Sequence, residues 1–199
     1  MDDTWLIAGL GNPGKRYENT RHNIGFKVLD QLHSDWGGQN WSEKNGGAYS
    51  EFRRPGIGRI ILIKPLEFMN RSGGAVSRLA AFFKVDTQKI IALHDDVDLY
   101  FGSLRIKVGG GDGGHNGIKS LVQCLGSADF IRIRVGVGRP DVETVGRQSQ
   151  TEEPGLAGWV LGAFSPDEQK ELSALVKRGV TACELILSEG VLRAQNAFN

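Results

Sequence analysis

The sequence lacks most features that mark secreted, membrane or metal-binding proteins. Its only two cysteines, Cys124 and Cys183, form no CxxC or Cys/His cluster, so we expect two buried, reduced thiols and neither a disulfide nor a metal site. No apolar run approaches the ~20 residues of a membrane helix. The N-terminus lacks the basic start of a secretory signal. These absences predict a cytoplasmic protein that requires no metal and no other cofactor.

Charge of one sign is also scarce, because the net charge is only +1. A protein that binds nucleic acid over its whole surface is therefore excluded. However, residues 102–139 carry six basic side chains against two acidic ones: Arg105, Lys107, Lys119, Arg132, Arg134 and Arg139. A polyanionic partner should contact this region, provided that folding brings these side chains to one face.

Glycine, in contrast, is abundant. The chain has 28 glycines in 199 residues, about twice the usual frequency of roughly 7%. They gather in three segments, Gly9–Gly14, Asn70–Gly74 and Gly109–Gly117. Backbone shape should therefore matter at these three places.

The length fits one domain over residues 1–199. Apolar spacing predicts strands at 5–9, 49–53, 59–64, 89–93, 103–108 and 131–137, and helices at 23–36, 72–84, 115–125 and 165–188. The alternation indicates the α/β class, a single-domain fold whose mixed, mostly parallel sheet has helices on both faces. In the last strand, Arg132 and Arg134 alternate with apolar residues and predict a solvated face. Residues 138–157 have no periodicity and are predicted to form a mobile loop.

Gly9–Gly14 matches the pattern G-x-G-x-x-G after a strand, which invites a dinucleotide-binding alternative. That fingerprint requires a helix directly after the third glycine and an acidic residue about 20 positions later, at the end of a second strand. Here the polar stretch 15–22 intervenes, and the region of Asp30 is itself helical. The favoured interpretation is a rigid turn that presents Asn12 at the end of the first strand.

Polar side chains follow three more predicted strands. Asn70 comes after the strand at 59–64, Asp95 follows the strand at 89–93, and His115 with Asn116 begins the helix after the strand at 103–108. Open α/β sheets bind ligands at the carboxyl ends of their strands. We therefore expect one site at this edge of the sheet.

His22 lies on the segment that leaves the Asn12 turn, so it should be close to the same site. An imidazole becomes an effective general base when a carboxylate holds its other nitrogen. Asp95 is the best-placed carboxylate, with Asp96 and Asp98 as alternatives. There is no G-x-S-x-G elbow and no reactive cysteine setting. A histidine–aspartate pair without a nucleophile suggests direct attack by water, with asparagine amides orienting the water and stabilising an oxyanion.

Several motifs, in this order, resemble the bacterial-type peptidyl-tRNA hydrolases. They are Gly9–Gly14 with Tyr17, Thr20–Asn23 with Gly25-Phe26, Phe68-Met69-Asn70, His94-Asp95-x-x-Asp98-Leu99, Gly109–Gly117 and Gly136-x-Gly138. The resemblance implies hydrolysis of the ester between a peptide and the 3′-terminal ribose of tRNA. It also implies a monomer whose partner is peptidyl-tRNA. The alternative is a non-catalytic RNA-binding relative, like the plant chloroplast splicing factors of this fold.

The resemblance also implies roles for individual residues. His22 would be the catalytic base and Asp95 its orienting partner. The amides that position peptide and water would be Asn12, Asn70 and Asn116. The cleft would be lined by Tyr17, Phe68 and Met69, with His115 in support. Lys107 and Arg134 would contact the phosphates of tRNA, in agreement with the basic stretch found above.

Overall fold

A seven-stranded sheet with the order β2-β3-β4-β1-β5-β7-β6 forms the centre of the protein. The computed structural model describes residues 3–140 and 155–199. The strands are β1 (Thr4–Gly9), β2 (Ser42–Lys44), β3 (Gly47–Arg54), β4 (Gly58–Pro65), β5 (Ile90–Asp96), β6 (Leu104–Val108) and β7 (Ile131–Gly136). The four central strands β4, β1, β5 and β7 are parallel, and the outer strands pair antiparallel. The prediction of a mixed, mostly parallel sheet is confirmed.

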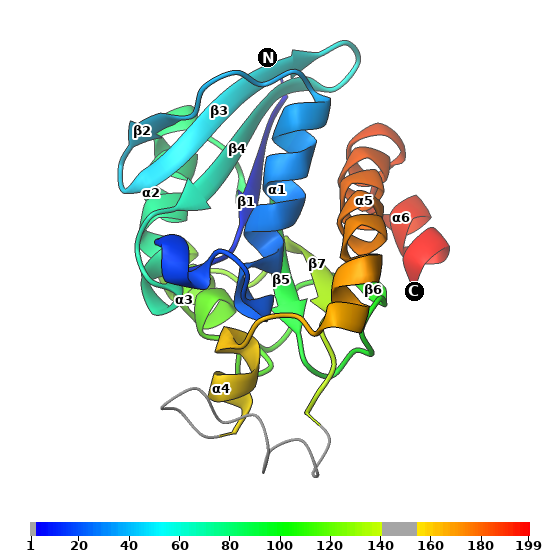
Figure 1. Cartoon of the computed structure of the whole chain (residues 1–199). Helices are drawn as coiled ribbons and strands as arrows, with labels where there is room; N and C mark the ends of the chain where they lie inside the picture. The colour runs from blue at the N-terminus through cyan, green and yellow to red at the C-terminus, as the bar shows by residue number, and fades with distance from the viewer. Residues whose placement is uncertain (1–2, 141–154) are drawn as a thin grey trace.

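Helices cover both faces of this sheet (Figure 1). On one face lie α1 (Ile24–Asp35), α5 (Pro166–Glu189) and α6 (Val191–Phe198), and on the other α2 (Ser72–Phe83) and α3 (Asn116–Leu125). The short helix α4 (Leu156–Leu161) lies near the carboxyl ends of the central strands. Within the described ranges no helix is long and apolar enough to cross a membrane.

The central strands are continuous apolar runs because both of their faces are buried. In β1, Ile7 packs into the core under α1 and α5, whereas Leu6 and Ala8 pack into the core under α2 and α3. Burying each Leu or Ile side chain contributes roughly 1.5–3 kcal/mol. Helix α1 approaches the sheet closely at Gly25, where an added Cβ would lie 2.3 Å from the carbonyl oxygen of Leu93. This contact fixes the start of α1, and the segment before it, against β5.

The start of α5 follows its sequence signals. Ser165 accepts a hydrogen bond from the backbone N–H of Glu168, the Glu168 carboxylate accepts one from the backbone N–H of Ser165, and Pro166 is the first helical residue. This reciprocal arrangement is a capping box. The predicted helix start is confirmed.

Three sequence expectations need correction, and three elements were not predicted. Helix α4 begins at Leu156, inside the predicted loop 138–157, of which residues 141–154 lie outside the described part of the chain. Cys124 is exposed, although Cys183 is buried as expected and burial raises the pKa of its thiol. Arg132 is buried, so the predicted face of β7 is not fully solvated. The elements β2, α4 and α6 were not predicted.

Candidate active site

A cavity of about 460 Å³ opens at the carboxyl ends of the central strands. Five separate segments bring polar side chains to it: Asn12, His22, Asn70, Asp95, His115 and Asn116 all line it. The prediction that these residues meet at one edge of the sheet is confirmed. Parallel strands cause this, because their carboxyl ends meet at the same edge.

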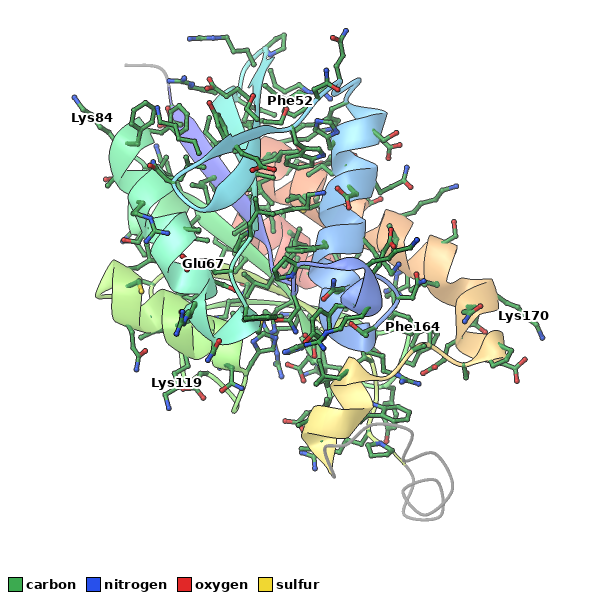
Figure 2. All side chains as sticks on the ribbon, turned by 60° about the vertical axis from the view of Figure 1, so that its left-hand side comes forward. Phe52, Glu67, Lys84, Lys119, Phe164 and Lys170 are labelled. Carbon is green, nitrogen blue, oxygen red and sulfur yellow. The ribbon has the colours of Figure 1, made fainter. Side chains whose placement is uncertain are left out.

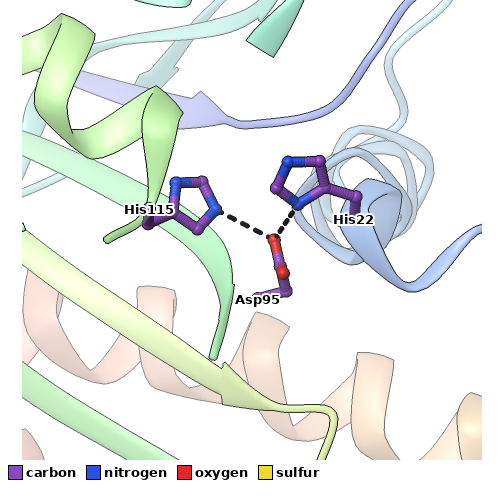
Figure 3. A group of neighbouring side chains, drawn as sticks. All are labelled: His22, Asp95 and His115. Atoms are coloured by element: carbon purple, nitrogen blue, oxygen red, sulfur yellow. Dashed lines mark hydrogen bonds and ion pairs between the residues drawn. The ribbon is translucent and has the colours of Figure 1, made fainter. Parts of the chain in front are cut away.

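A buried carboxylate, that of Asp95 at the end of β5, lines the cavity. A single oxygen, Oδ1, lies 2.8 Å from Nδ1 of His22 and 2.9 Å from Nε2 of His115 (Figure 3). The Asp95 side chain is only 2% exposed. Two imidazoles from different segments therefore share one buried carboxylate oxygen.

Local hydrogen bonds assign the proton on each ring. Nδ1 of His115 accepts the backbone N–H groups of Gly117 and Ile118 at 3.1 and 3.3 Å, so the proton of His115 is on Nε2 and is donated to Asp95. His22 faces the same oxygen through Nδ1, which must donate as well. In the neutral ring, Nε2 of His22 then carries a lone pair, as a general base requires.

Electrostatics keep Asp95 ionised. Burial on its own would raise the pKa of this carboxyl group, but favourable electrostatic interactions with His22 and His115, and the hydrogen bonds from their N–H groups, hold the pKa well below its usual range. At His94, the residue before Asp95, burial lowers the pKa to about 3, assisted by His115, so this ring is neutral. The carboxylate is therefore negative wherever its partner histidine can act as a base.

His22, Asp95 and His115 offer three ligand atoms within 4.8 Å of one another, the size of a metal site. The hydrogen bonds argue against this use. Because Nδ1 of His115 accepts two N–H groups, Nε2 carries the proton and has no lone pair for a metal ion. The residues fit a hydrogen-bonded triad better than a coordination shell.

Asn12 is held by three hydrogen bonds. Its side-chain Oδ1 accepts the backbone N–H of Met69 at 2.7 Å. Its backbone N–H donates to Oδ1 of Asn23 at 2.8 Å, and Nδ2 of Asn23 donates to the Asn12 carbonyl at 2.9 Å. With its oxygen engaged, Asn12 offers its Nδ2 group to the cavity as a donor. The orienting role of Asn23 is not evident from the sequence, in which Asn23 is marked only as part of the Thr20–Asn23 motif.

The apolar side of the cavity includes Phe68 and Met69, as expected. Phe68 is 53% exposed at the rim, whereas Met69 is buried. Tyr17 is not among the lining residues and reaches the cavity only through Phe68, whose ring lies edge-on at 6.2 Å between centroids.

Lys107 and Arg134 also line the cavity. In the β6–β7 ladder Lys107 lies opposite Arg132, and Arg105 lies opposite Arg134, so all four cations share one face. Arg132 differs from the others because its guanidinium donates to the carbonyls of Gly111 and Gly110 at 2.6 and 2.8 Å. Only part of the basic stretch is therefore available to a polyanion.

Comparison with known proteins decides the family. The family described as peptidyl-tRNA hydrolase matches residues 6–199. The chain is 47% identical to the peptidyl-tRNA hydrolase of Rhodococcus erythropolis, over 99% of this chain and 98% of that protein. It is 43% identical to that of Renibacterium salmoninarum, over 100% and 98%. The crystal structure of peptidyl-tRNA hydrolase from Acinetobacter baumannii has a TM-score of 0.85 at 32% identity, covering 100% of this chain and 96% of that one.

The chain belongs to the peptidyl-tRNA hydrolase family.

The dinucleotide-binding alternative is thereby wrong, and the structure gives the reason: after Gly14 the chain forms only a short 3-10 turn, Lys15–Tyr17. The acidic residue that the fingerprint requires is also missing, since Asp30 lies on α1.

One wall of the peptidyl-tRNA hydrolase cavity was missed in the sequence. Leu156, Val160 and Leu161 of α4 line it. Arg21, next to His22, anchors this helix: its guanidinium lies 3.6 Å from the centre of the Trp159 ring and 2.7 Å from Glu168. The sequence gives little indication of this wall, because α4 is only six residues long. Nor does the sequence distinguish a buried arginine from an exposed one. Phe164 lies on the short segment that connects α4 to α5 (Figure 2).

Proposed function

We propose that this chain hydrolyses the ester bond between a peptide and the 3′-terminal ribose of tRNA, with His22 as the general base. The observation that carries the proposal is the 2.8 Å hydrogen bond between Nδ1 of His22 and Oδ1 of Asp95, at the wall of the cavity. It leaves Nε2 of His22 free to accept a proton. A water molecule between Nε2 and the ester carbonyl would be the nucleophile.

The reaction needs one proton to move twice. His22 takes a proton from water as the oxygen attacks the ester carbonyl, and a tetrahedral oxyanion forms. The oxyanion collapses, the bond to the ribose oxygen breaks, and the imidazolium returns its proton to that oxygen. Asp95 stabilises the imidazolium, and the Nδ2 group of Asn12 is a suitable donor to the oxyanion or to a peptide carbonyl.

Amide side chains also give a reason for selectivity. Asn70 and Asn116 lie on two adjoining segments at the cavity and can pair with a peptide group. An aminoacyl-tRNA offers a charged amine in place of that group and would leave these amides unpaired, and such mismatches discriminate strongly. We expect Lys107 and Arg134 to contact phosphates of the tRNA.

The proposal includes three further points: the reaction proceeds without a metal ion, one chain suffices for it, and it takes place in the cytoplasm, where it would return tRNA to translation. The proton on Nε2 of His115 supports the first of these. The similar proteins reported above are all named as peptidyl-tRNA hydrolases and give no support to a non-catalytic RNA-binding relative.

The direct test is the release of an N-blocked amino acid from tRNA by the purified protein. We expect turnover with the wild-type chain, also in the presence of a chelator. His22→Ala should lower kcat by about 10²–10⁴-fold, the usual contribution of a general base.

The control is tRNA binding by the same variant, measured by gel shift, which should stay close to that of the wild type. Near-normal hydrolysis by His22→Ala would contradict the proposal, and so would a wild-type chain that binds tRNA without cleaving the ester.

A further inference from the structure

We infer that Asp96 is a positioning residue for tRNA, which holds the guanidinium of Arg134 in the orientation that receives a phosphate. The inference rests on the proposed function, because it concerns how the same site binds its substrate. Both residues line the cavity.

The contact between them is short and partly buried. Nε of Arg134 donates to Oδ2 of Asp96 at 2.6 Å, and the two side chains are 25% and 12% exposed. The other carboxylate oxygen, Oδ1, accepts the backbone N–H of Asp98 at 2.9 Å. Because each oxygen has its own donor, the Asp96 carboxylate cannot rotate without breaking a hydrogen bond.

A guanidinium held in this way keeps its phosphate-binding groups available. The bond to Asp96 uses Nε, so the parallel pair of N–H donors that the two Nη groups form at the end of the planar guanidinium stays available. A phosphate recognised by two parallel N–H donors needs such a fixed fork. An unrestrained arginine would lose side-chain entropy when it binds, whereas Arg134 is already ordered.

Charge gives a second reason for the pair. Arg134 lies directly opposite Arg105 in the β6–β7 ladder, and like charges across a ladder destabilise the sheet. Asp96 compensates part of this repulsion from the neighbouring strand β5. Among the described residues Arg105 and Lys107 form no ion pair, so Arg134 is the cation of this face that is fixed by a carboxylate.

The geometry of β5 places the Asp96–Arg134 contact next to the proposed catalytic pair, His22 and Asp95. Successive side chains in a strand point to opposite faces of the sheet. Asp95 and Asp96 are neighbours at the end of β5, and one contacts His22 while the other contacts Arg134. A single dipeptide thus fixes the spacing between the general base and a phosphate contact, which would place the ester carbonyl relative to the tRNA backbone.

Asp96→Asn tests this inference with little change in shape. An amide has one oxygen, so it cannot accept from both Asp98 and Arg134, and its NH₂ group would face one of the two donors. We expect weaker tRNA binding and a KM for N-blocked aminoacyl-tRNA that rises several-fold with little change in kcat. The slope of log Kd against log salt should fall by about 0.9, the value for one phosphate contact.

Three further variants make the test specific. Arg134→Gln should have the same effects, and the double variant should be no worse than Arg134→Gln alone, because both changes remove one contact. Asp96→Glu keeps both acceptors and should restore part of the affinity. Circular dichroism would verify that each variant is folded.

Unchanged or tighter binding by folded Asp96→Asn would overturn the inference, as would fully additive effects in the double variant. These outcomes are independent of the proposed function, which is tested by the cleavage of the ester by the wild-type chain and by His22→Ala. The salt slope can be measured even if the ester is not cleaved, because it needs binding alone.

Discussion

His115 shows how much one side chain can do at this site. Its Nδ1 caps α3 by accepting two backbone N–H groups, and its Nε2 donates to Asp95. The first contact fixes the tautomer that the second requires. His115 therefore stabilises the helix that carries Asn116 and also stabilises the carboxylate that orients His22.

Two substitutions at this residue separate these tasks. Asn is a good N-cap and Ala is not. We expect His115→Ala to lower the free energy of unfolding by about 1 kcal/mol through the lost cap, whereas His115→Asn should lose less. Both variants should lose hydrolytic activity, by about tenfold for one hydrogen bond near 1.4 kcal/mol, and much less than His22→Ala. Urea unfolding and hydrolysis of N-blocked aminoacyl-tRNA would measure the two effects. Equal stability losses in the two variants would contradict the capping role.

For the acidic partner of His22, the residues alone favour Asp95 and leave Asp96 and Asp98 as alternatives, and the family resemblance also implies Asp95. Strand alternation decides between Asp95 and Asp96, because the two side chains point to opposite faces. Asp98 lies beyond the strand and pairs with the exposed Arg139. To choose between Asp95 and Asp96 in this way, one must know the residue at which β5 ends, and strand ends are difficult to predict from a sequence. The supporting residues Asn23 and Arg21 could not be found, since their roles depend on contacts with distant segments.

Among the elements, β7 departs most from its prediction. Arg132 and Arg134 alternate with apolar residues, which is typical of a solvated face, but the glycine-rich segment folds over Arg132. The guanidinium supplies two donors to carbonyls of that segment, whose Gly110 has a φ of +86°. Arg132 thus shapes the loop that leads to His115 and Asn116. Its burial also lowers the pKa of its guanidinium, although the charge of Asp112 opposes this.

Arg132 and Lys107 therefore make a matched pair for mutation, since they are opposite neighbours with the same charge. Arg132→Met should lower the free energy of unfolding by about 1.5–3 kcal/mol, the value for hydrogen bonds to a charged group. Lys107→Met should change stability by less than about 0.5 kcal/mol and instead weaken tRNA binding and reduce its salt slope by about 0.9. Chemical denaturation and gel shifts at several salt concentrations would test both. A stable Arg132→Met with weak tRNA binding would mean that Arg132 acts as a phosphate ligand.

The short elements could not be predicted because their sequences carry few of the usual signals of a helix or a strand. Helix α4 has six residues and follows Gly155, which offers no side-chain cap. Helix α6 follows Gly190 at a φ of +85° in the same way. The strand β2 has only three residues, all exposed, so it has no apolar pattern. Long elements with a buried face were found because their patterns repeat over several turns or pairs.

At the scale of the whole molecule, the fold class followed from the alternation of strands and helices, but the order of the strands did not. β1 lies between β4 and β5, and β6 pairs at the far edge with β7. Tertiary contacts determine this order, for instance the packing of Gly25 against β5. Because these contacts join segments that are distant in the sequence, no local sequence pattern predicts them. The strand order is nevertheless what brings Asn12 and Asp95 to neighbouring positions.

The stability of the whole molecule should also depend on pH through His94. Burial lowers the pKa of His94 to about 3 in the folded state, whereas an unfolded histidine has a pKa of about 6.5. Below pH 6.5 the unfolded chain therefore binds a proton that the folded chain does not. The free energy of unfolding should fall with decreasing pH, by up to about 1.4 kcal/mol per unit from this residue. Asp95 contributes only below about pH 5, where the unfolded carboxyl group begins to bind a proton that the folded group, with its lowered pKa, does not.

His94→Gln isolates this contribution, since glutamine does not titrate and its amide can still donate to the Asp95 carbonyl, as Nδ1 of His94 does at 2.7 Å. The variant should be less stable than the wild type at pH 7, where the native ring packs against His115 at 4.8 Å between centroids. The difference should shrink as the pH falls from 7 to 4.5, because only the wild type loses the His94 contribution. Urea unfolding at several pH values would measure it. Parallel stability curves over this range would mean that the folded protein accommodates a charged His94.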